Sequence, residues 1–550
     1  MIISVMSTSK KKILIYDTTL RDGAQMRGIS FSLEDKLKIV RLLDKSNFHY
    51  IEGGWPGSNP KDCEFFDRVK DMEFKNAKIV AFGSTRRHDT LVEDDLNIKT
   101  LLEAKTPVVT LVGKSSSYQV KEVLCTTLEE NLNMISDSIR FLKEQGREVI
   151  YDAEHFFDGY KLDSGYSIET LKAAINAGVD GITLCDTNGG CLTWEIQDIV
   201  SKVSKLLKQE SLKSQNIKLG IHVHNDMGLA VINSMVAACE GCTLIQGTVN
   251  GYGERCGNAN LITIIPNLQI KMGYDCVPDL THLTELSHKV SGIANFNPDE
   301  HAPYVGLEAF AHKGGIHVSA VERDPQSYEH ITPETVGNKR KFVISELAGR
   351  SNVRVRAAEL GLKLSGNEKA VLNKVKELEH QGFQFENAEG TFELLLRKDS
   401  AGYKPPFEKI DMMVVSENRK PSVKTVEAVV KLKVGNTITH TVADGLGPVH
   451  ALDLAIRKSL LPYFPELAKV NLSDYKVRIL DPDKTTGATT RVTIDATYEG
   501  ERWSTVGVSY NIIEASYAAL IDSYELFLLR QQTALNDKKA SLNEKQVANS

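Results

Sequence analysis

The chain has 550 residues, too many for one hydrophobic core, so we expect two to four domains. Its 41% hydrophobic and 25% charged residues are typical of an ordinary globular protein, and its net charge of −6 leaves no basic excess to neutralise nucleic-acid phosphates. No apolar run approaches the ~20 residues that a membrane span needs, so we expect neither nucleic acid nor a membrane as a partner.

The first residues place a short apolar stretch, residues 1–6, ahead of the lysines at 10–12. A secretory signal has the reverse order, with the charge first. We therefore expect a cytoplasmic protein.

Up to about residue 285, short apolar runs alternate with amphipathic, helix-like segments such as residues 32–45, 127–145 and 168–177. There are eight runs: residues 13–16, 50–53, 79–82, 108–112, 149–152, 181–185, 219–224 and 244–249. Eight β/α repeats predict an α/β protein with a TIM (β/α)8 barrel over residues 1–285. Charged and polar residues follow several of the runs, at the strand ends where this fold carries its sites.

Two histidines stand two residues apart at the end of the seventh run, in Ile-His-Val-His-Asn-Asp. Strand side chains alternate faces, so His222 and His224 point the same way. With one carboxylate they would form a facial triad for a metal ion. The other interpretation is a histidine pair hydrogen-bonded in a core, and these residues alone do not separate the two.

The first run ends in a polar turn that carries Arg21, Asp22 and Gln25. Asp22 is the carboxylate that would complete the triad, and Arg21 offers a planar fork of donors that keeps its charge. Together with two histidines they suit binding and polarisation of a 2-oxo acid. A solvent-facing Arg–Asp pair is the alternative.

Residues 286–405 look mostly helical, with candidate helices at 279–293 and 368–381 and a glycine turn ahead of His317. A turn-rich stretch at 398–406 is typical of a linker. Residues 441–451 then match residues 505–515, and each copy has alternating strands feeding a helix. We predict two βββα units in a C-terminal α+β domain, residues 406–530, and a disordered polar tail, residues 531–550.

The motifs Asp-Thr-Thr-Leu-Arg-Asp-Gly (17–23), His-Val-His-Asn-Asp (222–226) and Asn-Gly-Tyr-Gly-Glu-Arg-Cys-Gly-Asn (250–258) resemble those of the 2-isopropylmalate synthase, homocitrate synthase and citramalate synthase family. The similarity runs in order over nearly the whole chain. Segments 51–62, 152–159 and 310–317 resemble the long bacterial-type citramalate synthase branch more than the isopropylmalate synthases.

The resemblance implies an acyltransferase that depends on a divalent metal, Mg²⁺, Mn²⁺ or Zn²⁺. It would condense acetyl-CoA with pyruvate and water to give (R)-citramalate and CoA, for isoleucine biosynthesis through 2-oxobutanoate. The alternative is 2-isopropylmalate synthesis from 2-oxoisovalerate, for leucine. A non-enzymatic amino-acid sensor with a decayed barrel is disfavoured, because the site residues are intact.

The resemblance also assigns roles to residues. Asp22, His222 and His224 would hold the metal with Asn258 as a fourth ligand, while Arg21 would stabilise charge on oxygen. Catalysis would further use Glu154, His317 as the base, and Tyr328; nothing local identifies His317, which would otherwise pass for a surface histidine. Substrate would contact Gln25 and Thr187, with the pocket closed by Phe82, Leu111 and Val112.

The C-terminal repeat resembles the regulatory domain of the family. This implies isoleucine as a feedback effector and a homodimer as the assembly. A dimerisation module without a ligand is the alternative interpretation.

Overall fold

The computed structural model describes residues 11–211, 217–345, 347–362, 364, 366–400, 402–420 and 423–548. The N-terminal segment 1–10, on which the cytoplasmic expectation depends, lies outside these residues. The chain forms two compact units, Met1–Phe310 with Thr332–Lys339, and Ala311–Ile331 with Arg340–Ser550. Each unit is described by itself.

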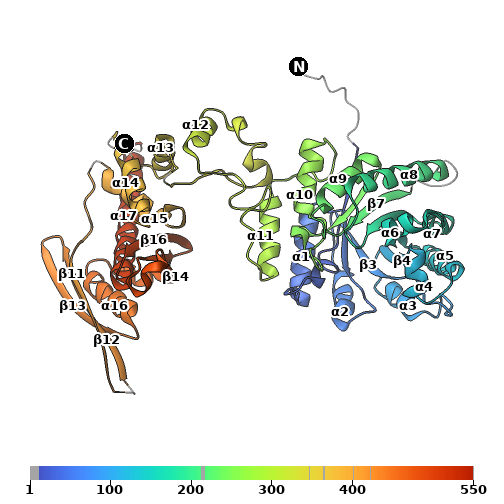
Figure 1. The fold of residues 1–550 in the computed structure, drawn as a ribbon, viewed down its shortest axis with the longest axis horizontal. Coiled ribbons are helices and arrows are strands. Elements are labelled where there is room, and N and C mark those ends of the chain that lie inside the picture. Colours follow the sequence, from blue (N-terminus) through green and yellow to red (C-terminus); the bar gives the residue numbers. More distant parts are fainter. Residues whose placement is uncertain are drawn as a thin grey trace. The chain divides into compact units, whose positions relative to one another are not determined.

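The first unit contains a closed barrel of eight parallel strands, shown in blue to green in Figure 1. The strands are β1 (Leu14–Asp17), β2 (Tyr50–Gly54), β3 (Lys78–Ser84), β4 (Val108–Lys114), β5 (Glu148–Glu154), β6 (Gly181–Asp186), β7 (Lys218–Val223) and β8 (Leu244–Gly247). Each pairs with its neighbour in sequence, and β8 pairs with β1. The predicted TIM barrel is confirmed.

Helices surround the barrel, as expected for β/α repeats. They are α1 (Leu33–Lys45), α2 (Pro60–Val69), α3 (Leu96–Glu103), α4 (Ser117–Glu122), α5 (Leu128–Glu144), α6 (Phe156–Leu162), α7 (Ser164–Asn176), α8 (Thr193–Ser211), α9 (Ala230–Glu240) and α10 (Leu261–Pro266). The sequence marks their starts: Ser32 and Asp35 form a capping box at α1, and the Thr127 hydroxyl caps α5.

Alternate residues of each strand face the barrel interior. The lower interior layer is apolar and consists of Leu14, Tyr16, Tyr50, Val80, Val108, Ile150 and Leu244. Residues two or four positions later on the same strands therefore also face inward, nearer the carboxyl ends. These later positions are mostly polar. The barrel interior therefore has an apolar, packed layer near the amino ends of the strands and a polar layer near their carboxyl ends.

A further helix, α11 (Leu283–Ile293), packs on α1 and on the turn after β8. The Asn250 side-chain amide donates to the Ser287 carbonyl over 3.0 Å and to the Ser291 hydroxyl over 2.9 Å. The first compact unit thus continues past residue 285, the predicted end of the barrel domain.

The second unit begins with two short strands, β9 (Ala311–His312) and β10 (Lys341–Phe342), and the helices α12 (Gly315–Arg323), α13 (Arg350–Glu359), α14 (Glu368–His380) and α15 (Glu389–Asp399). A small core that includes Val353, Val375, Phe385 and Phe392 holds α13, α14 and α15 together. The mostly helical character predicted for this region is confirmed.

The two predicted βββα repeats are present. The first comprises β11 (Glu408–Lys420), β12 (Val423–Val434), β13 (Thr437–Gly445) and α16 (Pro448–Leu460). The second comprises β14 (Asn471–Ile479), β15 (Thr490–Tyr498), β16 (Glu501–Ser509) and α17 (Ile512–Ala548). Each repeat forms an antiparallel three-stranded sheet.

Glycines at the strand ends let each sheet approach its helix. A Cβ on Gly445 would lie 2.4 Å from the Ala451 nitrogen, and a Cβ on Gly507 would lie 2.0 Å from the Ala515 carbonyl oxygen. Ala451 and Ala515 occupy the same place in the two repeats, and both are fully buried. Close packing of strand on helix therefore accounts for these two glycines.

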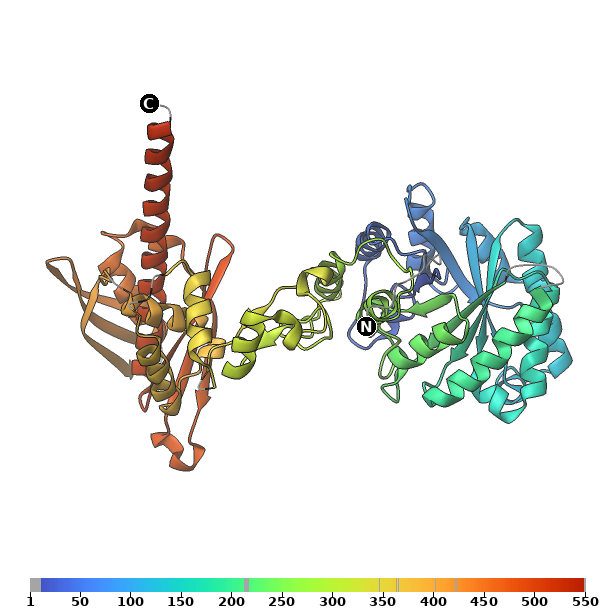
Figure 2. The same cartoon turned by 90° about the horizontal axis from the view of Figure 1, so that it is seen from above.

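The predicted disordered tail is wrong for residues 531–548, which continue α17 (Figure 2). Their low apolar content led to the prediction of disorder. However, Ala, Leu, Lys, Glu and Gln have high helix propensity, and here they extend a helix already nucleated by its buried first half. Residues 549–550 lie outside the described residues.

Candidate active site and metal centre

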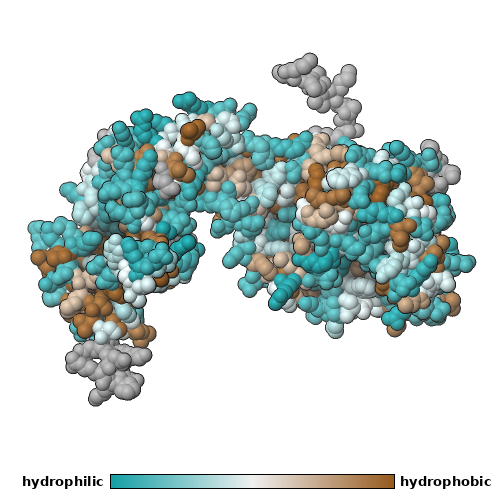
Figure 3. All heavy atoms as spheres, in the orientation of Figure 1, coloured by the Kyte–Doolittle hydropathy of each residue, from teal (hydrophilic) through white to brown (hydrophobic). Residues whose placement is uncertain are grey.

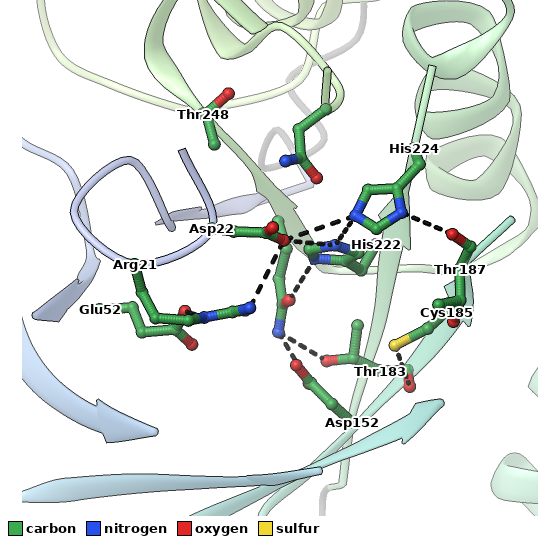
Figure 4. Close-up of polar contacts among 12 residues, drawn as sticks. Arg21, Asp22, Glu52, Asp152, Thr183, Cys185, Thr187, His222, His224 and Thr248 are labelled. Atoms are coloured by element: carbon green, nitrogen blue, oxygen red, sulfur yellow. Dashed lines mark hydrogen bonds and ion pairs between the residues drawn. The ribbon is translucent and has the colours of Figure 1, made fainter. Parts of the chain in front are cut away.

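Three predicted metal ligands converge at the carboxyl end of the barrel. Asp22 follows β1, His222 lies in β7 and His224 directly follows β7; Figure 4 shows Asp22 facing both histidines. The Asp22 Oδ2 atom lies 3.2 Å from His222 Nε2 and 3.5 Å from His224 Nε2, and the two Nε2 atoms are 3.4 Å apart. All three side chains are at most 11% exposed. This geometry favours a metal site over a merely hydrogen-bonded pair.

The other ring nitrogen of each histidine is held by an acceptor. His222 Nδ1 donates to the Gln246 side-chain oxygen over 2.9 Å, and His224 Nδ1 donates to the Thr187 carbonyl over 2.6 Å. In the neutral form of each ring the hydrogen therefore lies on Nδ1, and Nε2 keeps a lone pair that can ligate a metal ion. Ligating histidines are commonly oriented in this way.

Asn258 provides an independent test of whether these residues fit a metal. Its backbone bridges to His224, and its side chain is 2% exposed. The side-chain nitrogen donates to the Tyr252 carbonyl over 3.1 Å, whereas Oδ1 is buried without a partner among the described residues. A buried acceptor without a donor is costly. With two imidazoles and a carboxylate, this amide oxygen makes a donor set that suits a divalent cation.

Arg21 is held from three sides. Its Nε donates to Glu52 Oε1 over 2.5 Å, its Nη1 lies 3.6 Å from Asp22 Oδ2, and its guanidinium stacks 3.9 Å from the centre of the Phe82 ring. The Tyr16 hydroxyl in turn donates to Glu52 Oε2 over 2.6 Å. The guanidinium is thus fixed beside the metal site before any substrate binds.

Glu52 is one of the charged residues at the ends of the predicted strands, but the sequence alone gave it no role in the site. It is fully buried in β2, within the otherwise uncharged run Tyr50–Gly54. A carboxylate inside a buried strand needs a cationic partner. That pattern could have identified it.

The charges around Asp22 favour its ionised form. Burial alone would raise its pKa, but Arg21 and the hydrogen bonds from His222 and His224 outweigh burial and hold the pKa well below its usual value. Burial would lower the pKa of His222, and Asp22 reverses this and raises it. Asp22 is therefore available as an anionic ligand at neutral pH.

A buried polar network beneath the metal site was also missed. Gln246 in β8 donates through Nε2 to Asp152 Oδ1 over 2.9 Å and to the Thr183 hydroxyl over 3.1 Å. Burial raises the pKa of Asp152 to about 6. The sequence feature that could have predicted this network is a polar residue at an inward-facing position of a strand, Gln246 in β8 and Asp152 in β5.

The remaining predicted barrel residues have mixed surroundings. Glu154 forms an ion pair with Lys114, at the neighbouring strand end. The Thr187 hydroxyl accepts from the His155 backbone N–H over 2.9 Å, so this residue contributes its carbonyl to His224 and its hydroxyl to the loop. Gln25 is exposed in the turn after Asp22.

The three pocket candidates differ in direction. Phe82 pairs with Thr110, whose hydroxyl contacts Tyr16 inside the barrel, so both face inward. Leu111 is the next residue after Thr110 and therefore faces the surrounding helices. This corrects the predicted place of Leu111 in the pocket, whereas Val112, which was also predicted there, has the same parity as Thr110 and faces inward.

His317 and Tyr328 belong to the second unit, where the structure brings them together. Their ring centres are 4.3 Å apart. His317 lies in α12, and Tyr328 is 49% exposed. An accessible imidazole beside a phenol is available for proton transfer.

Among the helices of the described residues, none has the length and apolar character that a bilayer span requires.

Comparisons with known proteins agree with this architecture. Family models match three successive regions: HMGL-like over residues 12–290, homocitrate synthase post-HMGL domain-like over 304–382, and the LeuA allosteric (dimerisation) domain over 386–528. The chain is 49% identical to the (R)-citramalate synthase of Synechocystis sp., over 97% of this chain and 100% of that protein.

Further relatives define the branch. The (R)-citramalate synthase of Geobacter sulfurreducens is 48% identical over 96% of this chain and 99% of its own length. A 2-isopropylmalate synthase of Sulfolobus acidocaldarius is 31% identical over 70% of this chain and 95% of its own. The chain therefore belongs to the 2-isopropylmalate synthase and homocitrate synthase family, within its citramalate synthase branch.

Proposed function

We propose that this protein is a divalent-metal-dependent acyltransferase that condenses acetyl-CoA with pyruvate and water to give (R)-citramalate and CoA. The observation that carries the proposal is the convergence of Asp22, His222 and His224 beside the fixed guanidinium of Arg21. Full-length similarity to (R)-citramalate synthases supports the choice of product.

A divalent ion at Asp22, His222, His224 and Asn258 would supply Lewis-acid polarisation of the keto group. Arg21 donates to the oxygen that becomes negatively charged when the new bond forms, and Glu52 keeps its guanidinium in place. Because this donor is positioned beforehand, little reorganisation accompanies the reaction.

The condensation needs a base for a methyl proton of acetyl-CoA. We assign this role to His317, with Tyr328 beside it as a hydrogen-bonding partner for the thioester or the transferred proton. The resulting carbanion attacks C2 of pyruvate, and the alkoxide so formed takes up a proton. Water then cleaves the thioester and releases CoA. Glu154, paired with Lys114, would relay protons near the substrate.

Pyruvate carries only a methyl group beyond its ketone, so its pocket is small. Phe82, held under Arg21 by stacking, and Val112 would close it. The Thr187 hydroxyl retains a proton to donate to the substrate carboxylate, and Gln25 lies in the turn beside Asp22.

A CoA-release assay with a panel of 2-oxo acids tests the proposal. Pyruvate should be the preferred acceptor, and EDTA should abolish turnover until Mg²⁺ or Mn²⁺ is restored. Preference for 2-oxoisovalerate would assign the protein to 2-isopropylmalate synthesis instead.

We further propose that the protein is a cytoplasmic homodimer inhibited by isoleucine. The match to a dimerisation domain supports self-association, and apolar residues gather on the surface over the β11–β13 sheet (Figure 3). On the face of this sheet opposite to buried Ala428 and Val430, Met413, Val429 and Val442 form a row across the three strands, and Met413 and Val442 are 53% and 40% exposed. A second copy would cover the row.

A further inference from the structure

The centre of the barrel holds one fully buried amide, that of Gln246 in β8. It joins side chains from three other strands: His222 of β7, Asp152 of β5 and Thr183 of β6. All of them are at most 5% exposed. The amide therefore links the metal site to the interior of the barrel.

Every hydrogen-bonding group of this amide has a partner. Its oxygen accepts from His222 Nδ1, and its nitrogen donates one hydrogen to Asp152 and one to Thr183. A carboxylate accepts hydrogen bonds, so the amide nitrogen must face Asp152 and the amide oxygen must face His222. His222 must then carry its hydrogen on Nδ1, which leaves Nε2 free to ligate.

The two histidines thus differ in their support. His224 is oriented by the Thr187 backbone carbonyl, which also accepts from Arg255 Nη2 over 2.9 Å, and Arg255 Nη2 lies 3.0 Å from His224 Nδ1. His222 is oriented by the Gln246 side chain. A carboxylate at position 246 would face Asp152 directly, whereas the neutral amide transmits the orientation without like-charge repulsion.

We propose that Gln246 is a positioning residue: held by Asp152 and Thr183, it fixes the ring orientation and tautomer of His222 and so sets metal affinity. The inference rests on the proposed metal site and not on the choice of 2-oxo acid. Partners of ligating histidines typically contribute about 10–100-fold to metal affinity.

The test is calorimetric titration of full-length, metal-free protein with Mn²⁺ alone. Gln246→Leu keeps the buried volume but removes the acceptor, and should bind Mn²⁺ about 10–100-fold more weakly than the wild type. Gln269→Leu is the matched control. The Gln269 side-chain oxygen accepts a hydrogen bond from the Val277 backbone N–H over 3.1 Å, and this bond does not involve His222. Gln269→Leu should therefore bind Mn²⁺ like the wild type. Unfolding midpoints are measured for both.

The double variant Asp152→Asn/Gln246→Glu is the rescue. It exchanges amide and carboxylate, so the new amide at position 152 can donate to the new carboxylate at position 246, which again accepts from His222. We expect it to recover most of the wild-type affinity for Mn²⁺. If Gln246→Leu does not fold, the comparison of this double variant with the wild type tests the proposal.

The proposal is overturned if folded Gln246→Leu binds Mn²⁺ as tightly as the wild type, or if the folded double variant binds it at least 10-fold more weakly than the wild type. A wild-type protein that binds no Mn²⁺ would instead refute the metal site itself.

Discussion

The proposed metal ligands illustrate how much depends on single residues. Each of the three charged or imidazole ligands is nearly buried, and both histidines are held by a contact on the side away from the site. Barrel stability resides mainly in the apolar layer below them. Changes to the ligands should therefore affect chemistry more than folding.

The first prediction concerns His224→Ala. Loss of a ligand should weaken Mn²⁺ binding by more than the ~100-fold upper limit for a supporting residue and abolish CoA release. The circular dichroism spectrum should be unchanged. Near-normal turnover with added Mn²⁺ would contradict the ligand assignment.

The second prediction concerns His317→Ala. A base acts on acetyl-CoA rather than on the keto acid, so kcat should fall by about 10²–10⁴-fold with little change in the KM for pyruvate. Steady-state kinetics check this. A raised KM with unchanged kcat would remove His317 from the role of base.

Within secondary-structure elements, strand parity decides which side chains meet the substrate. Thr110 and Val112 of β4 face the barrel interior, while Leu111 between them is fully buried against the helices. The same alternation places Glu52 of β2 beside Arg21 and Gln246 of β8 beside His222. Along each barrel strand, only every second side chain can therefore contact the substrate or the metal site.

The third prediction compares two neighbours on β4. Leu111→Ala should cost about 2–5 kcal/mol of stability and leave the preference for pyruvate unchanged. Val112→Ala should raise kcat/KM for 2-oxobutanoate relative to pyruvate by about 10-fold, since one methylene corresponds to ~1–3 kcal/mol. Denaturation and the oxo-acid panel measure both, and reversed effects would refute the parity argument.

The fourth prediction concerns the junction of β1 and β2. His49 Nδ1 accepts from the Ile15 backbone N–H over 3.1 Å, and burial, followed by repulsion from Lys12, lowers the pKa of His49 to about 4. An unfolded histidine has a pKa of about 6.5. Between pH 6.5 and 4 the unfolded chain therefore binds more protons, so stability falls as the pH falls, by about 2–3 kcal/mol in total.

His49→Gln keeps an acceptor for Ile15 but does not titrate, so it should lose less stability than the wild type between pH 7 and 5. Trp55 and Trp194 lie in the first unit and Trp503 in the second. Fluorescence-detected denaturation in a Trp503→Phe background therefore reports on the barrel. Equal pH dependence of the two proteins would exclude His49 as the cause.

For the molecule as a whole, the repeat domain combines assembly with regulation in our proposal. Its two sheets and two helices share one hydrophobic core. A ligand or a partner that changes the packing of one repeat should therefore also change the packing of the other. Feedback inhibition requires different affinities for active and inactive states, typically ~1–3 kcal/mol of coupling.

The fifth prediction uses Val442→Glu, which places a charge in the apolar row on β11–β13. Light scattering should show a shift from dimer to monomer, and inhibition by millimolar isoleucine should be lost. Leu91→Glu, a similar change at a 67% exposed leucine of the barrel unit, should alter neither. If isoleucine, leucine and valine all fail to inhibit the wild type, the domain is better interpreted as an assembly module.

The sequence by itself determined the barrel and the repeat and indicated the candidate metal triad, because each has a local pattern. Apolar runs alternate with amphipathic segments, two copies of a strand–turn–helix recur, and a His-x-His pair follows a strand. These patterns depend on periodicities of 2 and 3.6 residues, which neighbouring residues reveal.

Only the tertiary structure decided how the triad is held. Glu52, Gln246 and Asp152 meet Arg21 and His222 because barrel closure brings strands far apart in the sequence to one centre. The register of β4 excluded Leu111 from the predicted pocket and left Phe82 and Val112 in it. The tail from residue 531 became a helix because it continues a packed one. Each outcome depends on contacts between distant segments, which no local pattern contains.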